Sequence, residues 1–190
     1  MIMGREMGNR FHLRLMSSRL EVGIISLATL ASVIVVGSPA QAYDNDRVDR
    51  RFAVVDTDNC VRVDGGLSVI AYSTYCQLND SVDNSYFEKD AGAMATKFEL
   101  HDSSGMLAKV EFHPLGEKLW VYDTRNDGDG VQVWLDVLCE GTGLGPFSVQ
   151  GTDNTIDYAV FDLNIAEGCD INVDILDSPE DLLFKTQAVA

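Results

Sequence analysis

The stretch MLAKVEFH, Met106 to His113, decides the fold class of this chain. Its apolar and polar residues alternate, with Ala108, Val110 and Phe112 on one face and Lys109, Glu111 and His113 on the other. Successive side chains of a β-strand point to opposite faces, so a period of two is typical of a half-buried strand. We therefore expect a strand with one face in the core and one face in solvent.

The same alternation recurs further along the chain. In VQVWLDVLC one face carries Val131, Val133, Leu135, Val137 and Cys139, and in CDINVDI one face carries Cys169, Ile171, Val173 and Ile175. Turn signals such as HDSSG, HPLGE and NDGDG separate the predicted strands at intervals of about 8 to 12 residues, as in sandwiches and barrels. The sequence thus predicts an all-β fold, an antiparallel β-sandwich of immunoglobulin-like or jelly-roll-like type.

Two segments depart from the alternation. In SPEDLLFK, residues 178–185, Ser178 suits a helix N-cap and Pro179 the first helical position, which predicts a short C-terminal helix. The polar segment 79–93 receives no assignment.

The first 42 residues resemble a secretory signal peptide. Four arginines precede an apolar run of 15 residues, Val22 to Val36, and small residues follow at Ala40 and Ala42. A membrane span needs about 20 apolar residues, so a cleaved signal is favoured over a permanent anchor. We expect residues 1–42 to be removed and residues 43–190 to form a single secreted domain.

Removal of this leader makes the chain more acidic. The leader carries four of the 14 basic and two of the 30 acidic residues, which leaves 10 basic and 28 acidic residues and a net charge of −18. Such a chain repels nucleic acid and anionic membrane surfaces. The sequence therefore predicts no nucleic-acid partner and no membrane association after cleavage.

Four cysteines, Cys60, Cys76, Cys139 and Cys169, lie after the leader. An even number in an exported chain indicates disulfides, and three pairings are possible. We favour Cys60–Cys76 and Cys139–Cys169, which close short loops. One objection is that a tight hairpin at residues 63–67 would leave the first pair roughly 20 Å apart, whereas a disulfide needs Cα atoms within about 7 Å.

Catalytic machinery is sparse. His101 and His113 are the only histidines after the leader, and both are expected to face solvent. The chain lacks a G-x-S-x-G nucleophile motif and a phosphate-binding glycine loop. Carboxylate pairs leave a small hydrolase as an alternative, but the sequence favours a protein that is not an enzyme.

Three aromatic residues are the candidate ligand-binding set. If residues 124–130 join their flanking strands as a hairpin, register places Trp120, Tyr122 and Trp134 on one side, opposite the apolar stripe. An exposed aromatic row could stack on sugar rings or on a peptide. Alternatively a second layer covers this face, and the rings stabilise the sheet by cross-strand pairing.

The loop RNDGDG raises a second candidate, a calcium site at Asp127 and Asp129. A helix–loop–helix site that starts at Asp123 fails, because Arg125 and Trp134 occupy its ligand positions 3 and 12. Asn, Asp and Gly also suit a hairpin turn. The turn is favoured, and calcium is the one cofactor that the sequence suggests.

The run GEKLWVYDTRNDGDGVQVWLDV, Gly116 to Val137, resembles a motif of small secreted actinobacterial proteins, as do GTGLG at 141–145 and LNIAEG at 163–168. The resemblance covers about half of the chain after the leader. It implies export, a β-sandwich and a bacterial source, and it carries over no activity and no functional residue.

Taken together, these patterns predict a secreted, acidic, non-catalytic β-sandwich that binds an extracellular partner such as a glycan or a cell-wall component. A carbohydrate-binding module using the aromatic face and a calcium-stabilised domain are the alternatives. Neither the ligand nor the oligomeric state follows from the sequence.

Overall fold

The computed structural model describes residues 43, 46–125, 127–149 and 155–190. The described residues form thirteen strands and no helix, so the all-β prediction is confirmed. The strands are β1 Asp49–Asp56, β2 Val61–Gly65, β3 Ile70–Ala71, β4 Tyr75–Leu78, β5 Ser85–Glu88, β6 Met94–Asp102, β7 Gly105–His113, β8 Lys118–Asp123, β9 Gln132–Val137, β10 Thr142–Phe147, β11 Asp157–Asp162, β12 Asp170–Ser178 and β13 Asp181–Val189.

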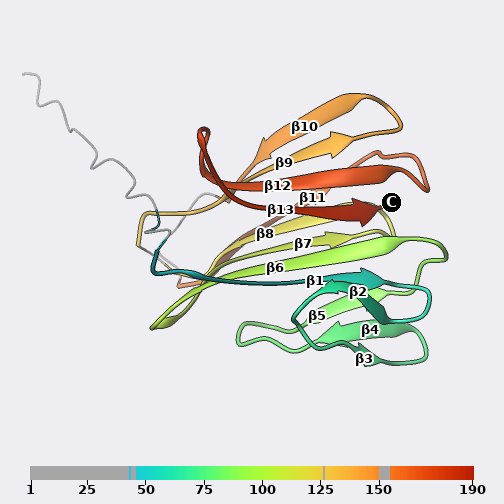
Figure 1. Ribbon diagram of the computed structural model, residues 1–190, viewed down its shortest axis with the longest axis horizontal. Helices are drawn as coiled ribbons and strands as arrows, with labels where there is room; N and C mark the ends of the chain where they lie inside the picture. The colour runs from blue at the N-terminus through green and yellow to red at the C-terminus, as the bar shows by residue number, and fades with distance from the viewer. Residues whose placement is uncertain (1–42, 44–45, 126, 150–154) are drawn as a thin grey trace, which may run out of the picture. The chain divides into compact units, whose positions relative to one another are not determined.

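Ten of these strands form one antiparallel sheet that folds over on itself (Figure 1). One half runs β2–β1–β6–β7–β8–β11 and the other runs β10–β9–β12–β13. The halves are joined between β6 and β13 through a single residue pair, Met94 and Val189. The result is the predicted antiparallel sandwich.

The core lies between the two halves and follows from the period of two. Alternate residues of the central strands are buried there, among them Phe98, Leu100, Val110, Phe112, Leu119, Val121, Val133, Leu135, Ile171, Val173 and Ile175. Each such side chain stabilises the fold by about 1.5–3 kcal/mol relative to exposure. The core residues predicted for strands 106–113, 131–139 and 169–175 are confirmed, except that Cys139 lies in the exposed turn after β9.

A small third layer, β3–β4–β5, covers the outer face of β1 and β6. A second apolar cluster fills the interface between them, with Cys76, Leu78 and Phe87 packed against Val55 and Ala95. The segment 79–93, unassigned from the sequence, supplies strand β5 and the loop that precedes it. This layer turns an expected solvent face into an interior.

Both predicted disulfides are confirmed. Cys60 and Cys76 have Cα atoms 5.2 Å apart, and those of Cys139 and Cys169 are 5.5 Å apart. The objection to the first pair was a hairpin at residues 63–67, and that hairpin does not form. Instead β2 pairs with β1, and the chain then crosses to the small sheet, which brings β4 back over Cys60.

The predicted C-terminal helix is wrong. Strand β12 continues to Ser178, Pro179 and Glu180 form a turn, and β13 returns along β12. Serine, proline and acidic residues serve a tight turn as well as a helix start. The hairpin is more stable than a helix here because it buries Leu183 and places Phe184 against the core.

The predicted hairpin between residues 118–123 and 132–137 is also wrong. Strand β8 pairs with β7 and β11, whereas β9 pairs with β10 and β12 in the other half of the sandwich. The connecting loop crosses between the layers. A period of two cannot tell a hairpin from such a crossing, because both leave the apolar face inside.

The predicted signal peptide, residues 1–42, lies outside the described residues. None of the described segments forms a helix capable of spanning a bilayer.

Candidate functional site

The outer face of β6, β7 and β8 is the most unusual region of the molecule, because charged side chains are buried on it. Lys97 and Lys109 are fully buried, and Glu99 and Glu111 nearly so. Register sets them out as a checkerboard, since Lys97 stands opposite Glu111 and Glu99 stands opposite Lys109. Opposite charges in such cross-strand pairs attract each other.

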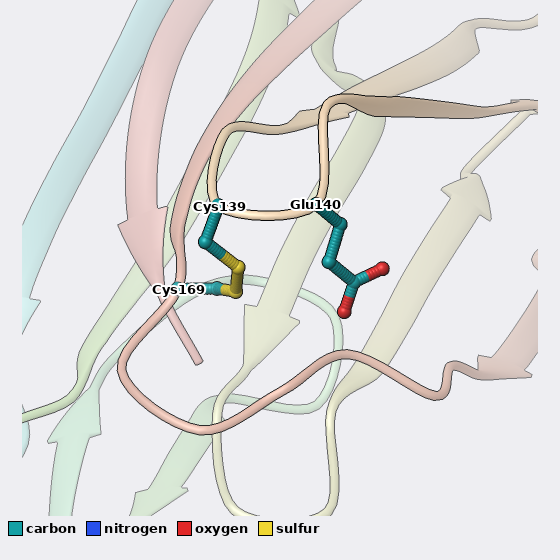
Figure 2. Close-up of side chains that lie close together, drawn as sticks. All are labelled: Cys139, Glu140 and Cys169. Carbon is teal, nitrogen blue, oxygen red and sulfur yellow. A yellow bond between two sulfur atoms is a disulfide. The ribbon is translucent and has the colours of Figure 1, made fainter.

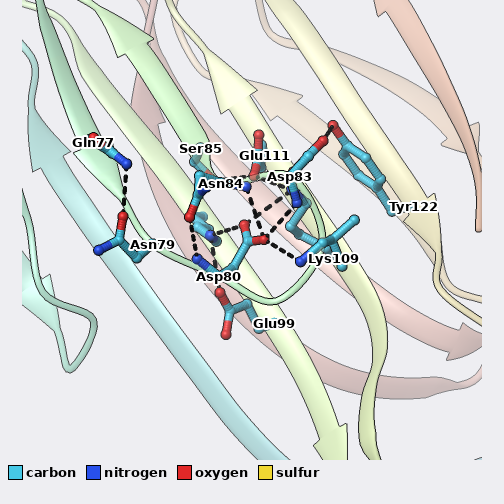
Figure 3. A network of polar contacts seen from close by, with 12 residues as sticks. Gln77, Asn79, Asp80, Asp83, Asn84, Ser85, Glu99, Lys109, Glu111 and Tyr122 are labelled. Carbon is cyan, nitrogen blue, oxygen red and sulfur yellow. Dashed lines mark hydrogen bonds and ion pairs between the residues drawn. The ribbon is translucent and has the colours of Figure 1, made fainter.

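The loop that follows β4 completes this charged layer with a fifth group, Asp80 (Figure 3). Its Oδ2 accepts hydrogen bonds from Lys97 Nζ at 2.5 Å and from Lys109 Nζ at 3.2 Å. Along the strands, Lys97 lies 3.0 Å from Glu99 and Lys109 lies 3.0 Å from Glu111. We call Asp80, Lys97, Glu99, Lys109 and Glu111 the ionic layer.

Asp80 also builds the turn that carries it. Its Oδ1 accepts hydrogen bonds from the backbone N–H groups of Val82, Asp83 and Asn84, at 2.7, 3.0 and 3.1 Å. The Asn84 side chain in turn accepts a bond from the Asp80 N–H at 3.0 Å. One carboxylate therefore shapes the loop with one oxygen and holds two lysines with the other.

Three further side chains form hydrogen bonds to the two glutamates of the ionic layer. His101 Nε2 and His113 Nε2 each lie 2.9 Å from a glutamate of the same strand, Glu99 and Glu111 respectively. Both histidines were expected in solvent, and that expectation is wrong: His101 is buried and His113 is half-buried. Ser85 donates a hydrogen bond to Glu111.

Lys109 is the centre of the network. Besides Asp80 and Glu111 it contacts Asp83, and its ammonium lies 4.1 Å from the ring centre of Tyr122, a cation–π contact. The Tyr122 hydroxyl donates to Asp83 at 2.9 Å. The ammonium of Lys109 thus contacts three carboxylates and one aromatic ring.

The neighbours decide which protonation states the interior favours. Burial raises the pKa of Asp80 and of Glu111, but Lys97 and Lys109 beside Asp80, and His113 and Lys109 beside Glu111, leave both pKa values below the ordinary range. Burial likewise lowers the pKa of Lys109, and the surrounding carboxylates reverse that effect and raise it. The acids are therefore held ionised and the lysine protonated.

Among the described residues, Asp80, Asp83 and Glu111 place carboxylate oxygens close enough together to hold a metal ion. Lys109 already occupies that position, because its Nζ contacts all three carboxylates. An ammonium supplies the positive charge that a metal would bring. The arrangement is therefore a structural ion cluster.

A second group that could bind a metal consists of Cys139, Glu140 and Cys169 (Figure 2). The two sulfur atoms form a disulfide, so neither cysteine offers a thiolate ligand. The Glu140 carboxylate accepts a hydrogen bond from the Ala166 N–H at 3.1 Å. This group links the β9–β10 turn to the segment before β12.

The structure separates the three predicted aromatic residues. Trp120 and Tyr122 lie on the outer face of β8, whereas Trp134 lies on β9 in the other half of the sandwich. Tyr122 is buried, with 3% of its surface exposed, because the loop at Asp83 covers it. A continuous row of three exposed rings does not form, since it depended on the hairpin that is absent.

A different aromatic group forms around Trp120. Tyr158 of the edge strand β11 stacks on Trp120 and on Tyr122, with ring centres 5.8 and 5.4 Å apart. The His113 ring lies 5.6 Å from Trp120 on the opposite side. Tyr158 is 59% exposed and Trp120 is half-buried, so this group reaches the surface.

Beside Trp120 lies a pocket of about 260 Å³ between β5 and the β7–β8 turn. Its lining is Tyr86, Glu88, His113, Pro114, Leu115, Lys118 and Trp120. Tyr86 and Glu88 share the exposed face of β5, two positions apart. We call this the Trp120 pocket. It combines aromatic rings with one acidic and one basic side chain.

A larger groove, of about 660 Å³, is lined by Phe52, Val54, Val63, Asp64, Met94, Asn172, Phe184, Lys185, Thr186 and Gln187. Phe184 stacks there on Phe98 and lies 4.6 Å from Phe52 between ring centres. The rings of Phe52 and Phe184 therefore pack against the hydrophobic core. The groove is a depression along the edge of that core.

Asp127 and Asp129 use their carboxylates within their own loop. Asp127 Oδ1 accepts the Asp129 N–H at 3.1 Å, and Asp129 Oδ1 accepts the Gly130 N–H at 3.0 Å, as expected of a turn. Neither belongs to the metal-competent groups found among the described residues. Burial, followed by the charges of Asp177 and Asp127, raises the pKa of Asp129 to about 6.

The sequence contained a signal for the ionic layer that the alternation pattern alone did not reveal. The pentapeptides KFELH, residues 97–101, and KVEFH, residues 109–113, repeat one pattern of Lys, Glu and His on alternate positions. Antiparallel pairing of two such strands sets each lysine opposite a glutamate. No comparable signal marks Asp80, Tyr86 or Glu88, because the fold of segment 79–93 depends on distant contacts.

No protein-family model, no curated protein and no solved structure matches this chain. The fold and the site define it as a disulfide-bonded antiparallel β-sandwich with a buried ionic layer and an aromatic surface pocket. The resemblance to small secreted actinobacterial proteins stays a prediction.

Proposed function

We propose that this protein is a secreted, non-catalytic binding module that holds a glycan in the Trp120 pocket. The observation that carries the proposal is the set of rings at this pocket, Tyr86, His113 and Trp120, extended along the sheet by exposed Tyr158. Sugar rings offer an apolar face of C–H groups and a rim of hydroxyls. Aromatic rings can stack on the C–H face, and the side chains of Glu88 and Lys118 can form hydrogen bonds with the hydroxyls.

The rigidity of the pocket wall also favours binding. Trp120 lies on β8 between β7 and β11, and the His113 ring is held by its bond to buried Glu111. A ring fixed before binding loses little conformational freedom when the ligand arrives. The pocket volume of about 260 Å³ suits one sugar unit, with neighbouring units of a polymer lying along Tyr158.

A binding role is favoured over hydrolysis by the chemistry of the pocket. Most glycosidases use two carboxylates that flank the scissile bond. Of the described residues that line the Trp120 pocket, Glu88 alone carries a carboxylate. Glu111 lies behind His113 and is engaged by Lys109, Ser85 and His113.

Export is the second part of the proposal. The two disulfides suit an oxidising compartment. The predicted leader and the acidity of the remaining chain point the same way, since a strongly negative protein stays soluble and avoids nucleic acid and anionic lipid. A polysaccharide of the cell wall or of the surroundings is a partner available in that location.

The test exploits the fact that the chain has only two tryptophans, Trp120 and Trp134. In the variant Trp134→Phe, the remaining fluorescence comes from Trp120, and titration with a panel of chitin, cellulose, xylan and mannan oligosaccharides should shift it. In the matched variant Trp120→Phe, the same ligands should leave the signal of Trp134 unchanged.

Affinity is measured separately by calorimetry. Trp120→Ala should weaken binding about fivefold, because one aromatic stacking contact is worth on the order of 1 kcal/mol. Trp134→Ala should leave the affinity unchanged, because Trp134 is exposed on the other half of the sandwich. Absence of binding to every oligosaccharide of the panel, and to chitosan oligosaccharides tested beside it, would remove the proposal.

A further inference from the structure

The surroundings of the Trp120 pocket carry an excess of negative charge. Glu88 lies inside the pocket, and Asp162 is the cross-strand neighbour of Lys118 on the outer face of β8 and β11. Glu117 precedes Lys118, and its backbone C=O accepts the N–H of Leu163 at 3.0 Å, which ties this rim to the end of β11. Lys118 therefore has one acidic neighbour in the pocket, Glu88, and another across the strand pair, Asp162.

The rim is crowded enough for its acids to affect one another. Burial, followed by the negative charges of Glu167, Asp162 and Asp90, raises the pKa of Glu117. Lys118 offsets part of this charge locally. At longer range the chain after its predicted leader has a net charge of −18, so the field at the pocket favours cations.

The aromatic lining reinforces the same preference. The faces of tryptophan and tyrosine rings attract cations through their negative π-electron density, most strongly for tryptophan. Lys109 over Tyr122 already shows this contact within the molecule, at 4.1 Å. A ligand cation at Trp120 and Tyr86 would have Glu88 beside it as the counter-ion, since all three line one pocket.

We propose that the Trp120 pocket selects glycans with protonated amino groups, of the glucosamine type, over the same glycans in N-acetylated form. This proposal rests on the proposed function. The ammonium lies against Trp120 and Tyr86 with Glu88 as its partner, and the sugar ring stacks on the adjoining aromatic surface. Acetylation removes the charge and thus both attractions.

The test compares two ligands that differ only in this charge, the hexamer of glucosamine and the hexamer of N-acetylglucosamine, by calorimetry on the intact protein. The glucosamine hexamer should bind at least about tenfold more tightly, as expected of a charged contact at a partly enclosed aromatic site. Raising the salt from 50 to 500 mM should reduce this preference, because the Debye length shortens.

The variant Glu88→Gln should reduce the preference to about threefold or less, with little change in the affinity for the N-acetylated hexamer. Asp136→Asn is the matched control, because it removes the same charge from an exposed position on β9 in the other half of the sandwich, and it should keep the full preference.

The outcomes separate the two proposals. Equal affinity for both hexamers would overturn the selection for amino groups, and a preference that survives Glu88→Gln would overturn the role of Glu88 as the partner of the ammonium. Both outcomes leave glycan binding intact. Binding of poly-lysine with the same dependence on Trp120 would also overturn it, since the pocket would then recognise polycations of any kind. Failure of every glycan, this pair included, would overturn glycan binding itself.

Discussion

The two faces of strands β6 and β7 differ completely in chemistry and hardly at all in burial. Phe98, Leu100, Val110 and Phe112 on the inner face have no exposed surface. On the outer face, Lys97 and Lys109 are equally buried, and their glutamate partners expose no more than 3%. One pair of strands therefore serves both as the wall of an apolar core and as the floor of a buried salt cluster.

The comparison teaches that the two faces are stable for different reasons. Each apolar side chain contributes by leaving water, largely independently of its neighbours. A buried charge costs several kcal/mol to desolvate and is tolerated only while its partners remain in place. The outer face is therefore a set of mutually dependent residues, and losing one of them should cost more than the contact itself.

Removal of the central lysine should have the largest effect. Lys109→Met takes away the one ammonium that Asp80, Asp83 and Glu111 share and leaves Lys97 to balance the layer alone, so it should lower the free energy of unfolding by about 3–5 kcal/mol. Leu100→Ala on the inner face is the comparison, with an expected loss of about 2–5 kcal/mol from cavity formation. Urea unfolding measures both.

A double-mutant cycle then tells the two faces apart. Lys109→Met combined with Glu111→Gln should recover part of the loss, because the second change removes one unpaired charge. The same cycle on the inner face, with Leu100→Ala and Val121→Ala, should show no recovery. If the losses on the outer face simply add, the residues there act independently and the comparison fails.

The next largest loss of stability is expected when the small sheet β3–β4–β5, which covers the outer face, is loosened. Replacing Cys60 and Cys76 with alanine removes a crosslink between residues separated by 16 positions, with an expected loss of about 3 kcal/mol. Because β4 would lose its tether to the β1–β2 turn, amide exchange should accelerate in β4, β5 and the Asp80 loop. Loss of the Cys139–Cys169 disulfide should cost a similar free energy without accelerating exchange in those segments. If both variants show the same exchange pattern, the Cys60–Cys76 disulfide does not specifically hold β4 in place.

A change of charge alone at Asp80 should have a smaller effect. In Asp80→Asn the amide oxygen still accepts the three backbone N–H groups of the loop, whereas the charge that balances Lys97 is lost. The expected loss is about 2 kcal/mol at pH 7, in line with hydrogen bonds to charged groups. Because the pKa of Asp80 is lowered by folding, this contribution is present above pH 4 and disappears as the pH falls further. A loss that is the same at pH 3 and pH 7 would contradict it.

The smallest effect is expected at Asp129, where the sign reverses. Folding raises its pKa to about 6, so the folded state binds the proton more tightly, and stability falls as the pH rises from 4 to 6. Asp129→Asn should therefore stabilise the protein at pH 7 and have no effect at pH 4. Since the side chain is partly exposed, the gain should stay below about 1 kcal/mol. Thermal melting at the two pH values measures it, and a variant less stable than the wild type at pH 7 would contradict the prediction that the Asp129 charge destabilises the folded state.

Thermal melting also tests the predicted calcium site. If Asp127 and Asp129 bind calcium, the wild-type protein should melt at a higher temperature in calcium than in chelator, and Asp129→Asn should lose the difference. Equal melting temperatures would end the calcium prediction.

How far the sequence predicted this protein can be judged from the strand at Met106 to His113. Its period of two identified the strand and its core residues, because alternation is a local property of the extended chain. The same pattern predicted solvent for Lys109, Glu111 and His113. That inference failed because a residue's environment depends on what packs against it, and here segment 79–93 does.

The aromatic residues show the same limit. Parity correctly placed Trp120 and Tyr122 on one face of β8, but it could not decide that β9 belongs to the other half of the sandwich. The pocket beside Trp120 consequently includes Tyr86 and Glu88 from a distant segment in place of Trp134.

By itself, then, the sequence determined the strand period, the apolar core faces and the acidic charge, all of which depend on local spacing or composition. Only the tertiary structure decided which strands are neighbours, which charges are buried and which rings meet at the surface. The physical reason is that pairing partners and covering layers come from segments far apart in the chain. Their choice depends on the total free energy of packing, which no short stretch of sequence contains.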